Sequence, residues 1–282
     1  MVQYSSKLFK IVQYCSVLLL TILVSCEVIP EGERLTEVFT PSDTSQIKRA
    51  SLLIEYSGWR CMNCPNAAEV AHELKAQYGE DLVVVVMHPA SNPNTRYGNN
   101  QAVNFTCPEA DSMYISMGGT NTTPFPTGNV NGEQQGGNYF MGQDTWATQI
   151  SKYYGSSLMK MSQMVACAND EIDVMVEICN MGGNNLRAQL QIWLTEDGVV
   201  GKQIMPTGET NNEYEHNHLM RASVLPSVWG EEVELTSMTP TIYTSHYKLP
   251  EKVVAENSNV VSVVSVDGVV VQVKETKINK QE

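Results

Sequence analysis

The chain has 282 residues and carries 31 acidic side chains against 18 lysines and arginines, a formal net charge of −13. Because nucleic-acid phosphates require Lys and Arg for binding, this charge disfavours a nucleic-acid partner. The length is sufficient for two domains of ordinary size. Outside the N-terminal region, no segment approaches the roughly 18 apolar residues that a membrane-spanning helix needs.

The N-terminus has the pattern of a secretory signal peptide. Lys7 and Lys10 precede an apolar run over 17–24 that is too short to span a membrane. The run ends in Leu-Val-Ser-Cys26, which resembles a bacterial lipobox. We therefore expect residues 1–25 to be removed and Cys26 to be acylated as a lipid anchor; the alternative is an ordinary signal peptide that contains this cysteine. Removal deletes two lysines and no acids, so −13 becomes −15.

A cysteine pair, Cys61 and Cys64, lies between an apolar strand at 52–54 and a helical pattern at 66–78. Two thiols at this spacing on the first turn of a helix can form a small disulfide or act as a dithiol. The positive end of the helix favours a thiolate at Cys61, and Arg60 adds a positive charge beside it.

Strand, aromatic turn, Cys-x-x-Cys and helix resemble the redox corner of thioredoxin-fold proteins. Glu55 lies six residues before Cys61, at the offset of the buried thioredoxin carboxylate that helps to deprotonate the second cysteine. A buried carboxyl has a raised pKa and can act as a proton acceptor. A zinc site needs four ligands, and the chain has no second Cys-x-x-Cys. An inert structural disulfide stays open as the other alternative.

The pattern after the helix continues as the thioredoxin resemblance requires. Residues 82–87 are apolar throughout, which is typical of a buried parallel strand. His88 ends that strand, where it either faces the thiols or is a hydrogen-bonded core residue. Pro126 resembles the cis-proline that faces the cysteine pair and exposes backbone for an extended substrate; a trans proline in a turn is the alternative. A helix at 143–154 completes the domain.

The second half changes to short apolar or alternating segments without an amphipathic helix. Asn-Asp, Gly-Gly and Asp-Gly turns separate them, and Asp-Gly between apolar runs indicates a hairpin. The predicted strands cover 159–168, 171–179, 186–195, 199–204, 233–235 and 260–274. This pattern favours an antiparallel β-sandwich.

The order of these motifs, continued by Gln-Ile-Trp-Leu-Thr-Glu-Asp-Gly at 191–198 and Glu-Tyr-Glu-His-Asn-His-Leu-Met-Arg-Ala at 213–222, is similar to the twenty-eight-kilodalton outer-membrane protein family of Bacteroidetes lipoproteins. The resemblance covers residues 26 to about 278. It implies an α/β plus all-β protein at the outer membrane, without a cofactor. Where the family usually carries an arginine near the cis-proline, this chain has Gly132.

These inferences give a domain order for the whole chain. A lipidated tether at 26–48 follows the signal peptide at 1–25, a thioredoxin-like domain occupies 49–157, and an immunoglobulin-like sandwich occupies 158–282. The last two are expected to fold separately, because the composition changes at their boundary.

Other candidate sites have weaker patterns. His216 and His218 share one face if their segment is a strand, and they could bind a metal with Glu213 or Glu215; the alternative is that they order the end of a strand. Cys107 is a candidate third thiol or a buried unreactive one.

Two functions are compatible with the sequence. In the first, a surface lipoprotein exchanges disulfides: Cys61 attacks, Cys64 resolves, Glu55 relays the proton and Pro126 holds the substrate strand. In the second, the protein is a non-enzymatic adhesin or binding protein for extracytoplasmic or host proteins, and the cysteine pair is a structural disulfide. Fold alone does not decide between them.

Overall fold

The computed structural model describes residues 47–97 and 103–279. Cys26, the signal peptide and the tether up to residue 46 lie outside the described residues. The helices are α2 (Cys64–Tyr78), α3 (Pro108–Ser116) and α4 (Trp146–Ser151), with short 3₁₀ turns at Gly79–Asp81, Pro93–Thr95, Gln143–Thr145 and Ala255–Asn257. The strands are β1 (Ser51–Tyr56), β2 (Leu82–Met87), β3 (Thr127–Val130), β4 (Met159–Ala168), β5 (Glu171–Asn180), β6 (Leu186–Glu196), β7 (Val199–Ile204), β8 (Thr210–His216), β9 (Leu219–Ser223), β10 (Glu231–Leu235), β11 (Pro240–Lys248), β12 (Ser258–Val266) and β13 (Val269–Lys277).

The first part of the molecule is built around β1, which pairs in parallel with β2 and antiparallel with β3. Helix α2 packs on this sheet through Ala67, Ala71 and Leu74, which share a core cluster with Leu82 and Val84 of β2. The helix ends at Gly79, whose φ of 58° lies in the left-handed region that glycine tolerates. The predicted order of strand, cysteine pair, helix, parallel strand and proline corner is present.

Helix α2 begins at Cys64, so Cys61 lies just before the helix rather than on its first turn. The backbone N–H of Cys64 still donates to the Cys61 carbonyl at 3.3 Å, which continues the chain into the helix. Pro65 is accommodated in the first turn, where no intrahelical N–H bond is lost. The last helix of this part is also shorter than predicted, because α4 ends at Ser151.

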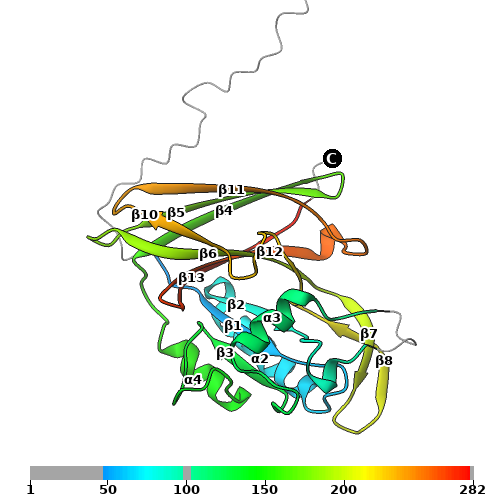
Figure 1. Ribbon diagram of the computed structural model, residues 1–282. Helices are drawn as coiled ribbons and strands as arrows, with labels where there is room; N and C mark the ends of the chain where they lie inside the picture. Colours follow the sequence, from blue (N-terminus) through cyan, green and yellow to red (C-terminus); the bar gives the residue numbers. More distant parts are fainter. Residues whose placement is uncertain (1–46, 98–102, 280–282) are drawn as a thin grey trace, which may run out of the picture. The chain divides into compact units, whose positions relative to one another are not determined.

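The second part is almost entirely β-structure. Strands β4, β5 and β11 form an antiparallel sheet in the order β11-β5-β4, while β13, β12 and β6 belong to the larger sheet (Figure 1). Apolar residues from both sheets, among them Ile172, Val176, Leu190, Ile192 and Val260, form one core. Two predicted hairpins are confirmed: Asn169-Asp170 joins β4 to β5 and Asp267-Gly268 joins β12 to β13. All four turn residues have positive φ, between 50° and 81°, as type I′ turns require.

One sheet runs through both parts of the chain, which the sequence does not predict. Its order is β13-β12-β6-β9-β2-β1-β3, with β10 added on β6. Strand β9 joins β2 through the bridge between Val86 and Leu219, and the Val86 N–H donates to the His218 carbonyl at 2.8 Å. All described residues belong to one compact unit.

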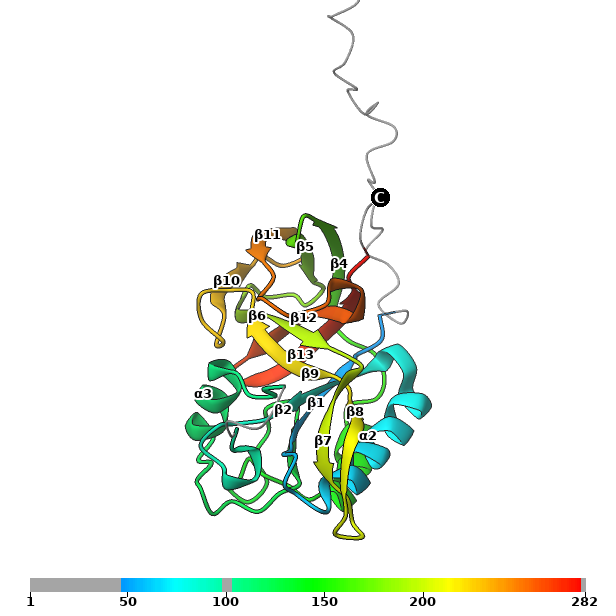
Figure 2. The same ribbon diagram turned by 90° about the vertical axis from the view of Figure 1, so that its right-hand side faces the viewer.

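The Asp197-Gly198 turn does not close the hairpin that its Asp-Gly pattern predicts. Strands β6 and β7 do not pair with each other; β7 pairs with β8 as a separate two-stranded ribbon. Instead of closing a hairpin, Asp197 accepts hydrogen bonds from the His218 N–H and the Asn259 amide at 2.7 and 2.8 Å. At this turn the chain leaves the large sheet and continues into the separate β7–β8 hairpin (Figure 2). The Asp197 hydrogen bonds hold the base of that hairpin.

Gly132 follows β3 and lies close to Gly268 in the turn between β12 and β13. It has a φ of 72°, and a Cβ atom at this position would overlap the Gly268 carbonyl oxygen. A longer side chain does not fit this backbone, because both the conformation and the close approach require glycine. Among the described residues, no helix has the length and apolarity that crossing a membrane requires.

Candidate redox site

The candidate site is the disulfide between Cys61 and Cys64, whose Cα atoms are 5.4 Å apart. Both cysteines are buried: 5% of Cys61 and 2% of Cys64 is exposed. The disulfide closes the corner between β1 and α2, where the predicted redox pair lies. Direct attack on either sulfur by a large substrate requires some local opening, because so little of the pair is exposed.

The turn before Cys61 is held by backbone groups of the following loop. The Arg60 N–H donates to the Asn94 carbonyl at 3.0 Å, and the Trp59 indole donates to the Arg96 carbonyl at 3.1 Å. A Cβ atom on Gly58 would lie 2.6 Å from the same Asn94 oxygen, so only glycine allows this approach. These contacts hold the turn that carries the cysteine pair in one backbone conformation.

Arg60 is exposed, and its guanidinium lies 4.7 Å from the centre of the Trp59 ring. In this cation–π contact the positive charge of the Arg60 guanidinium faces the Trp59 indole ring. The sequence expectation that Arg60 acts on the Cys61 thiol therefore stays a prediction.

The β7–β8 hairpin docks on the cysteine turn from the other half of the chain. The Gln203 side-chain amide donates to the Cys61 carbonyl at 2.9 Å, and the Ile204 N–H donates to the Trp59 carbonyl at 2.8 Å. Gln203 is 2% exposed, so its hydrogen bond is shielded from water. These contacts tie a residue 142 positions away in the sequence to the redox corner.

Glu55 lies on β1 and is 1% exposed. Neither carboxyl oxygen has a hydrogen bond of acceptable geometry. Burial raises the pKa of the Glu55 carboxyl to about 8, and the nearby Ser57 side chain offsets only part of this rise. A carboxyl with this pKa can both accept and release a proton near neutral pH.

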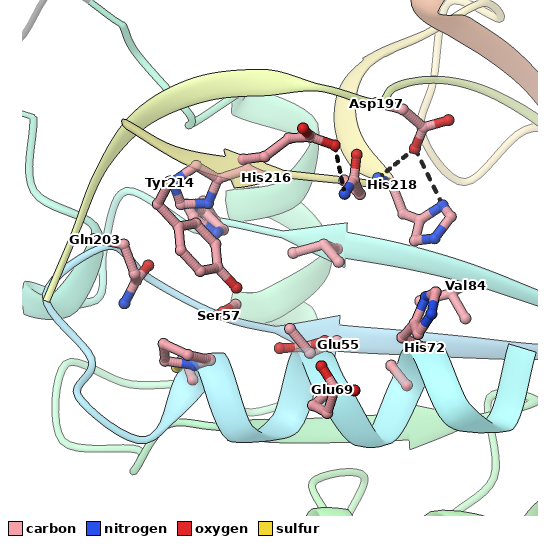
Figure 3. Close-up of a pocket in the computed structure, with 18 residues that line it drawn as sticks. Glu55, Ser57, Glu69, His72, Val84, Asp197, Gln203, Tyr214, His216 and His218 are labelled. Carbon is pink, nitrogen blue, oxygen red and sulfur yellow. Dashed lines mark hydrogen bonds and ion pairs between the residues drawn. The ribbon is translucent and has the colours of Figure 1, made fainter. Parts of the chain in front are cut away.

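Glu55 and Cys64 line the same cavity, which has a volume of about 460 Å³. Helix α2 forms one wall, β1 and β2 form the floor, and the β7–β8 hairpin forms the opposite wall (Figure 3). Tyr214 of the hairpin points toward Glu55 and Ser57. The cavity therefore gives the buried side of the cysteine pair a route to solvent beside an ionisable group.

His88 is buried beside His216, with 5.7 Å between their ring centres, and both rings contact Phe105. Burial holds the pKa of His88 well below its usual value, and the neighbouring His216 and Arg221 lower it further. Burial also lowers the pKa of His216 to about 4. Both imidazoles are therefore neutral at neutral pH and form part of the packing between β2 and the hairpin.

His216 and His218, the two histidines of the possible metal site, contact different polar groups. The His216 Nε2 atom lies 3.3 Å from the Lys202 carbonyl, and the His218 Nδ1 atom lies 3.2 Å from an Asp197 carboxylate oxygen. Within residues 47–97 and 103–279, no cluster of three or more His, Cys, Asp or Glu side chains has the geometry to hold a metal ion.

The remaining predicted residues lie in defined positions. The Phe125–Pro126 peptide bond is cis, as the sequence order indicates, while the role of Pro126 in substrate binding stays a prediction. Cys107 precedes α3, and burial raises the pKa of its thiol to about 12, so it is protonated at neutral pH. A protonated thiol is a poor resolving nucleophile.

Sequence reasoning correctly placed Cys61, Cys64 and Glu55 together at one corner, but missed Gln203 and Tyr214. These two lie in a polar hairpin that no motif links to the cysteines. The sequence signals for this hairpin are the turn residues at its two ends, Asp197-Gly198 and Gly208.

The fold and the site define a class of protein: a strand–disulfide–helix corner whose sheet continues into a β-rich second part. Comparison with known proteins then identifies the family. A family model described as outer membrane protein Omp28 matches residues 112–282. The chain belongs to this Omp28 family.

Several solved structures are similar to this chain at low sequence identity. HBP35 of Porphyromonas gingivalis is 16% identical, with a TM-score of 0.64 over 83% of this chain and 76% of that chain. A protein of Agrobacterium tumefaciens is 12% identical, with a TM-score of 0.50 over 82% and 96% of the two chains. A domain of the outer membrane lipoprotein Omp28 from P. gingivalis is 24% identical over 45% of this chain and 92% of that chain, with a TM-score of 0.33. No curated protein matches the chain.

Proposed function

We propose that this Omp28-family protein is an outer-membrane lipoprotein whose Cys61–Cys64 pair exchanges disulfides with other envelope proteins. The observation that carries the proposal is Glu55, a buried carboxyl with a pKa of about 8 on the cavity that also reaches Cys64. A structural disulfide does not need a buried ionisable group, which is costly to retain in a core.

The exchange reaction needs no component besides the substrate. In the reduced pair, the Cys61 thiolate attacks a substrate disulfide; a Cys61–substrate bond forms, the substrate S–S bond breaks, and one substrate thiolate leaves. Cys64 then transfers its proton to ionised Glu55 and attacks the Cys61 sulfur. The Cys61–Cys64 bond forms and the second substrate thiol is released, so two electrons pass from the protein to the substrate. The reverse sequence oxidises a substrate dithiol.

A second function is supported by the burial of both sulfurs and by the docked hairpin. If the Gln203 and Ile204 contacts never open, the disulfide stabilises the corner and the protein acts as an adhesin or binding protein. Its partners would then be extracytoplasmic or host proteins, bound elsewhere on the molecule.

Cys64→Ser tests the exchange reaction in cells. Without the resolving thiol, Cys61 should accumulate as mixed disulfides with envelope proteins, visible as reducible high-mass bands after acid quenching. Cys61→Ser is the matched control, because it leaves one thiol but removes the attacking one. Equal trapping by both variants, or by neither, would contradict the proposal.

We further propose that Cys26 carries the lipid that anchors the protein to the outer membrane, with the cell surface as its working location. The lipobox-like Leu-Val-Ser-Cys26 supports this, as does membership of a family named for an outer membrane protein. Labelled palmitate should mark the wild type and not Cys26→Ser, and the variant should leave the membrane fraction or remain uncleaved. An unlabelled wild type would contradict the anchor.

The immunoglobulin-like assignment of residues 158–282 is also a proposal. It is supported by strand order: β4-β5-β11 in one sheet and β13-β12-β6 in the other correspond to the A-B-E and G-F-C orders of immunoglobulin domains. In this assignment the β7–β8 hairpin and β9 are inserted between the third strand and the next strand of the first sheet. This inserted segment contacts the redox corner through Gln203 and Ile204.

A further inference from the structure

The cavity between α2 and the β7–β8 hairpin contains two buried polar groups without partners. Both Glu55 oxygens and the His88 Nδ1 atom are buried, and within the described residues none has a hydrogen bond of acceptable geometry, although the Ser57 side chain lies near the Glu55 carboxyl. Each of these two side chains is 1% exposed, and both line the cavity. Because buried polar groups in folded proteins are nearly always paired, these atoms indicate that the cavity accommodates a polar partner.

The charge of the cavity selects the sign of that occupant. Four carboxyl groups line it, those of Glu55, Glu69, Asp197 and Glu215, and none of the described lining residues is Lys or Arg. The Glu55 carboxyl, with a pKa of about 8, contributes its charge mainly from that pH upward. Burial raises the pKa of Tyr214, and the nearby Glu55 and Glu69 carboxyls raise it further. Neutral His88 adds an acceptor and no positive charge.

Part of the cavity wall is apolar. Val84 and Val86 of β2 and Ala68 of α2 line the cavity, and the Tyr214 ring forms part of the hairpin wall. A volume of about 460 Å³ lies in the range of small-molecule sites. Such walls accommodate a short hydrocarbon body, and an aromatic face is favourable to a cation.

We propose that this cavity binds a small organic cation, an ammonium group on a short apolar body. The ammonium donates to the Glu55 carboxylate and to the His88 ring, while the apolar body lies against Val84 and Val86. The site shares Glu55 with the proposed exchange reaction, but binding requires neither a free thiol nor a substrate disulfide, so it can be tested separately. It gives Glu55 a counter-ion and so couples the occupant to the ionisation of the group beside Cys64.

Calorimetric titration of the oxidised full-length protein at pH 8 tests this site. The probe is phenethylamine, and 2-phenylethanol is its neutral counterpart of similar size. We expect the amine to bind at least about tenfold more tightly than the alcohol, because only the amine carries the charge that Glu55 and Glu69 attract. Glu55→Gln should weaken amine binding at least about tenfold and leave alcohol binding unchanged.

Glu73→Gln is the matched control variant, since Glu73 is exposed on α2 and does not line the cavity. It should bind the amine like the wild type. Equal binding of amine and alcohol to the wild type, no binding of either, or unchanged amine binding in Glu55→Gln would each overturn the proposal. If Glu55→Gln does not fold, the amine and alcohol comparison on the wild type decides alone. Loss of this site would leave the exchange proposal intact, because no thiol takes part in the titration.

Discussion

Glu55 shows how far a single residue can be interpreted from sequence. Its offset from Cys61 and its place inside an apolar strand predict a buried carboxyl beside the thiols, and the structure confirms both the burial and the raised pKa. All six residues of β1 are buried, so Glu55 has no solvent-exposed face of the strand to occupy. The residue is therefore retained at an energetic cost, which is typical of a functional group.

The pH dependence of stability should reveal this cost. Glu55 has a pKa of about 8 when folded and an ordinary value of 4.5 when unfolded. Between these values the folded state binds the extra proton, so the Glu55 contribution lowers stability as pH rises from 4.5 to 8, by up to ~1.4 kcal/mol per pH unit. Glu55→Gln should remove this slope. The stability of the variant relative to the wild type should thus rise from pH 5 to pH 8.

Urea unfolding of both proteins at several pH values measures this difference. The buried histidines contribute equally to both proteins and cancel. Glu73→Gln, an exposed change on the same chain, should keep the wild-type slope. Parallel curves for the wild type and Glu55→Gln would show that the carboxyl is already ionised in the folded protein.

At the scale of elements, the β7–β8 hairpin is the feature that sequence reasoning could not place. Its strands are short and polar on one side, and its turn carries no signal for a partner. The contacts that matter, Gln203 to Cys61 and Ile204 to Trp59, join segments about half the chain apart. Local patterns predict the strands themselves but contain no information about such long-range docking.

Gln203→Ala should loosen the hairpin from the cysteine turn. The change removes the Gln203 donor and leaves the Cys61 carbonyl with the Cys64 N–H as its remaining partner, a loss of about 0.5–1.5 kcal/mol. If ~1 kcal/mol of this favours the opened hairpin, reduction of the disulfide by dithiothreitol should accelerate about fivefold. Stopped samples alkylated with a thiol reagent give the rate.

Val200→Ala is the control on the same hairpin, since Val200 is 51% exposed and lies away from the cysteines. It should be reduced at the wild-type rate. A Gln203→Ala rate equal to that of the wild type would mean that the hairpin does not limit access to the disulfide.

At the scale of the whole molecule, sequence predicts both parts but not how they are joined. The change from α/β to all-β is visible in the patterning, and most predicted strands match the observed ones. The two parts share one sheet because β9, which pairs with β6, also pairs with β2. Strand β9 has five residues and pairs with β2 by a single bridge. A core cluster includes Tyr56 and Val85 of the first part together with Trp193, Val261 and Val273 of the second.

This shared core predicts that the two parts unfold together. Separating them near residue 157 would expose the cluster on both sides, at a cost of ~25 cal/mol for each Å² of apolar surface. Chemical unfolding followed by far-ultraviolet circular dichroism and by tryptophan fluorescence should therefore give coincident single transitions. Two separated transitions would support the independent folding that the sequence suggests.

The reduction potential of the Cys61–Cys64 pair tests the central proposal most directly. The full-length protein is equilibrated in glutathione and dithiothreitol redox buffers, and the reduced fraction is quantified after acid quenching and alkylation. Exchange catalysis predicts a potential between about −120 and −270 mV, the range of exchange enzymes. A potential below about −300 mV, the range of structural disulfides, would contradict exchange and leave the pair as a structural bond in a binding protein.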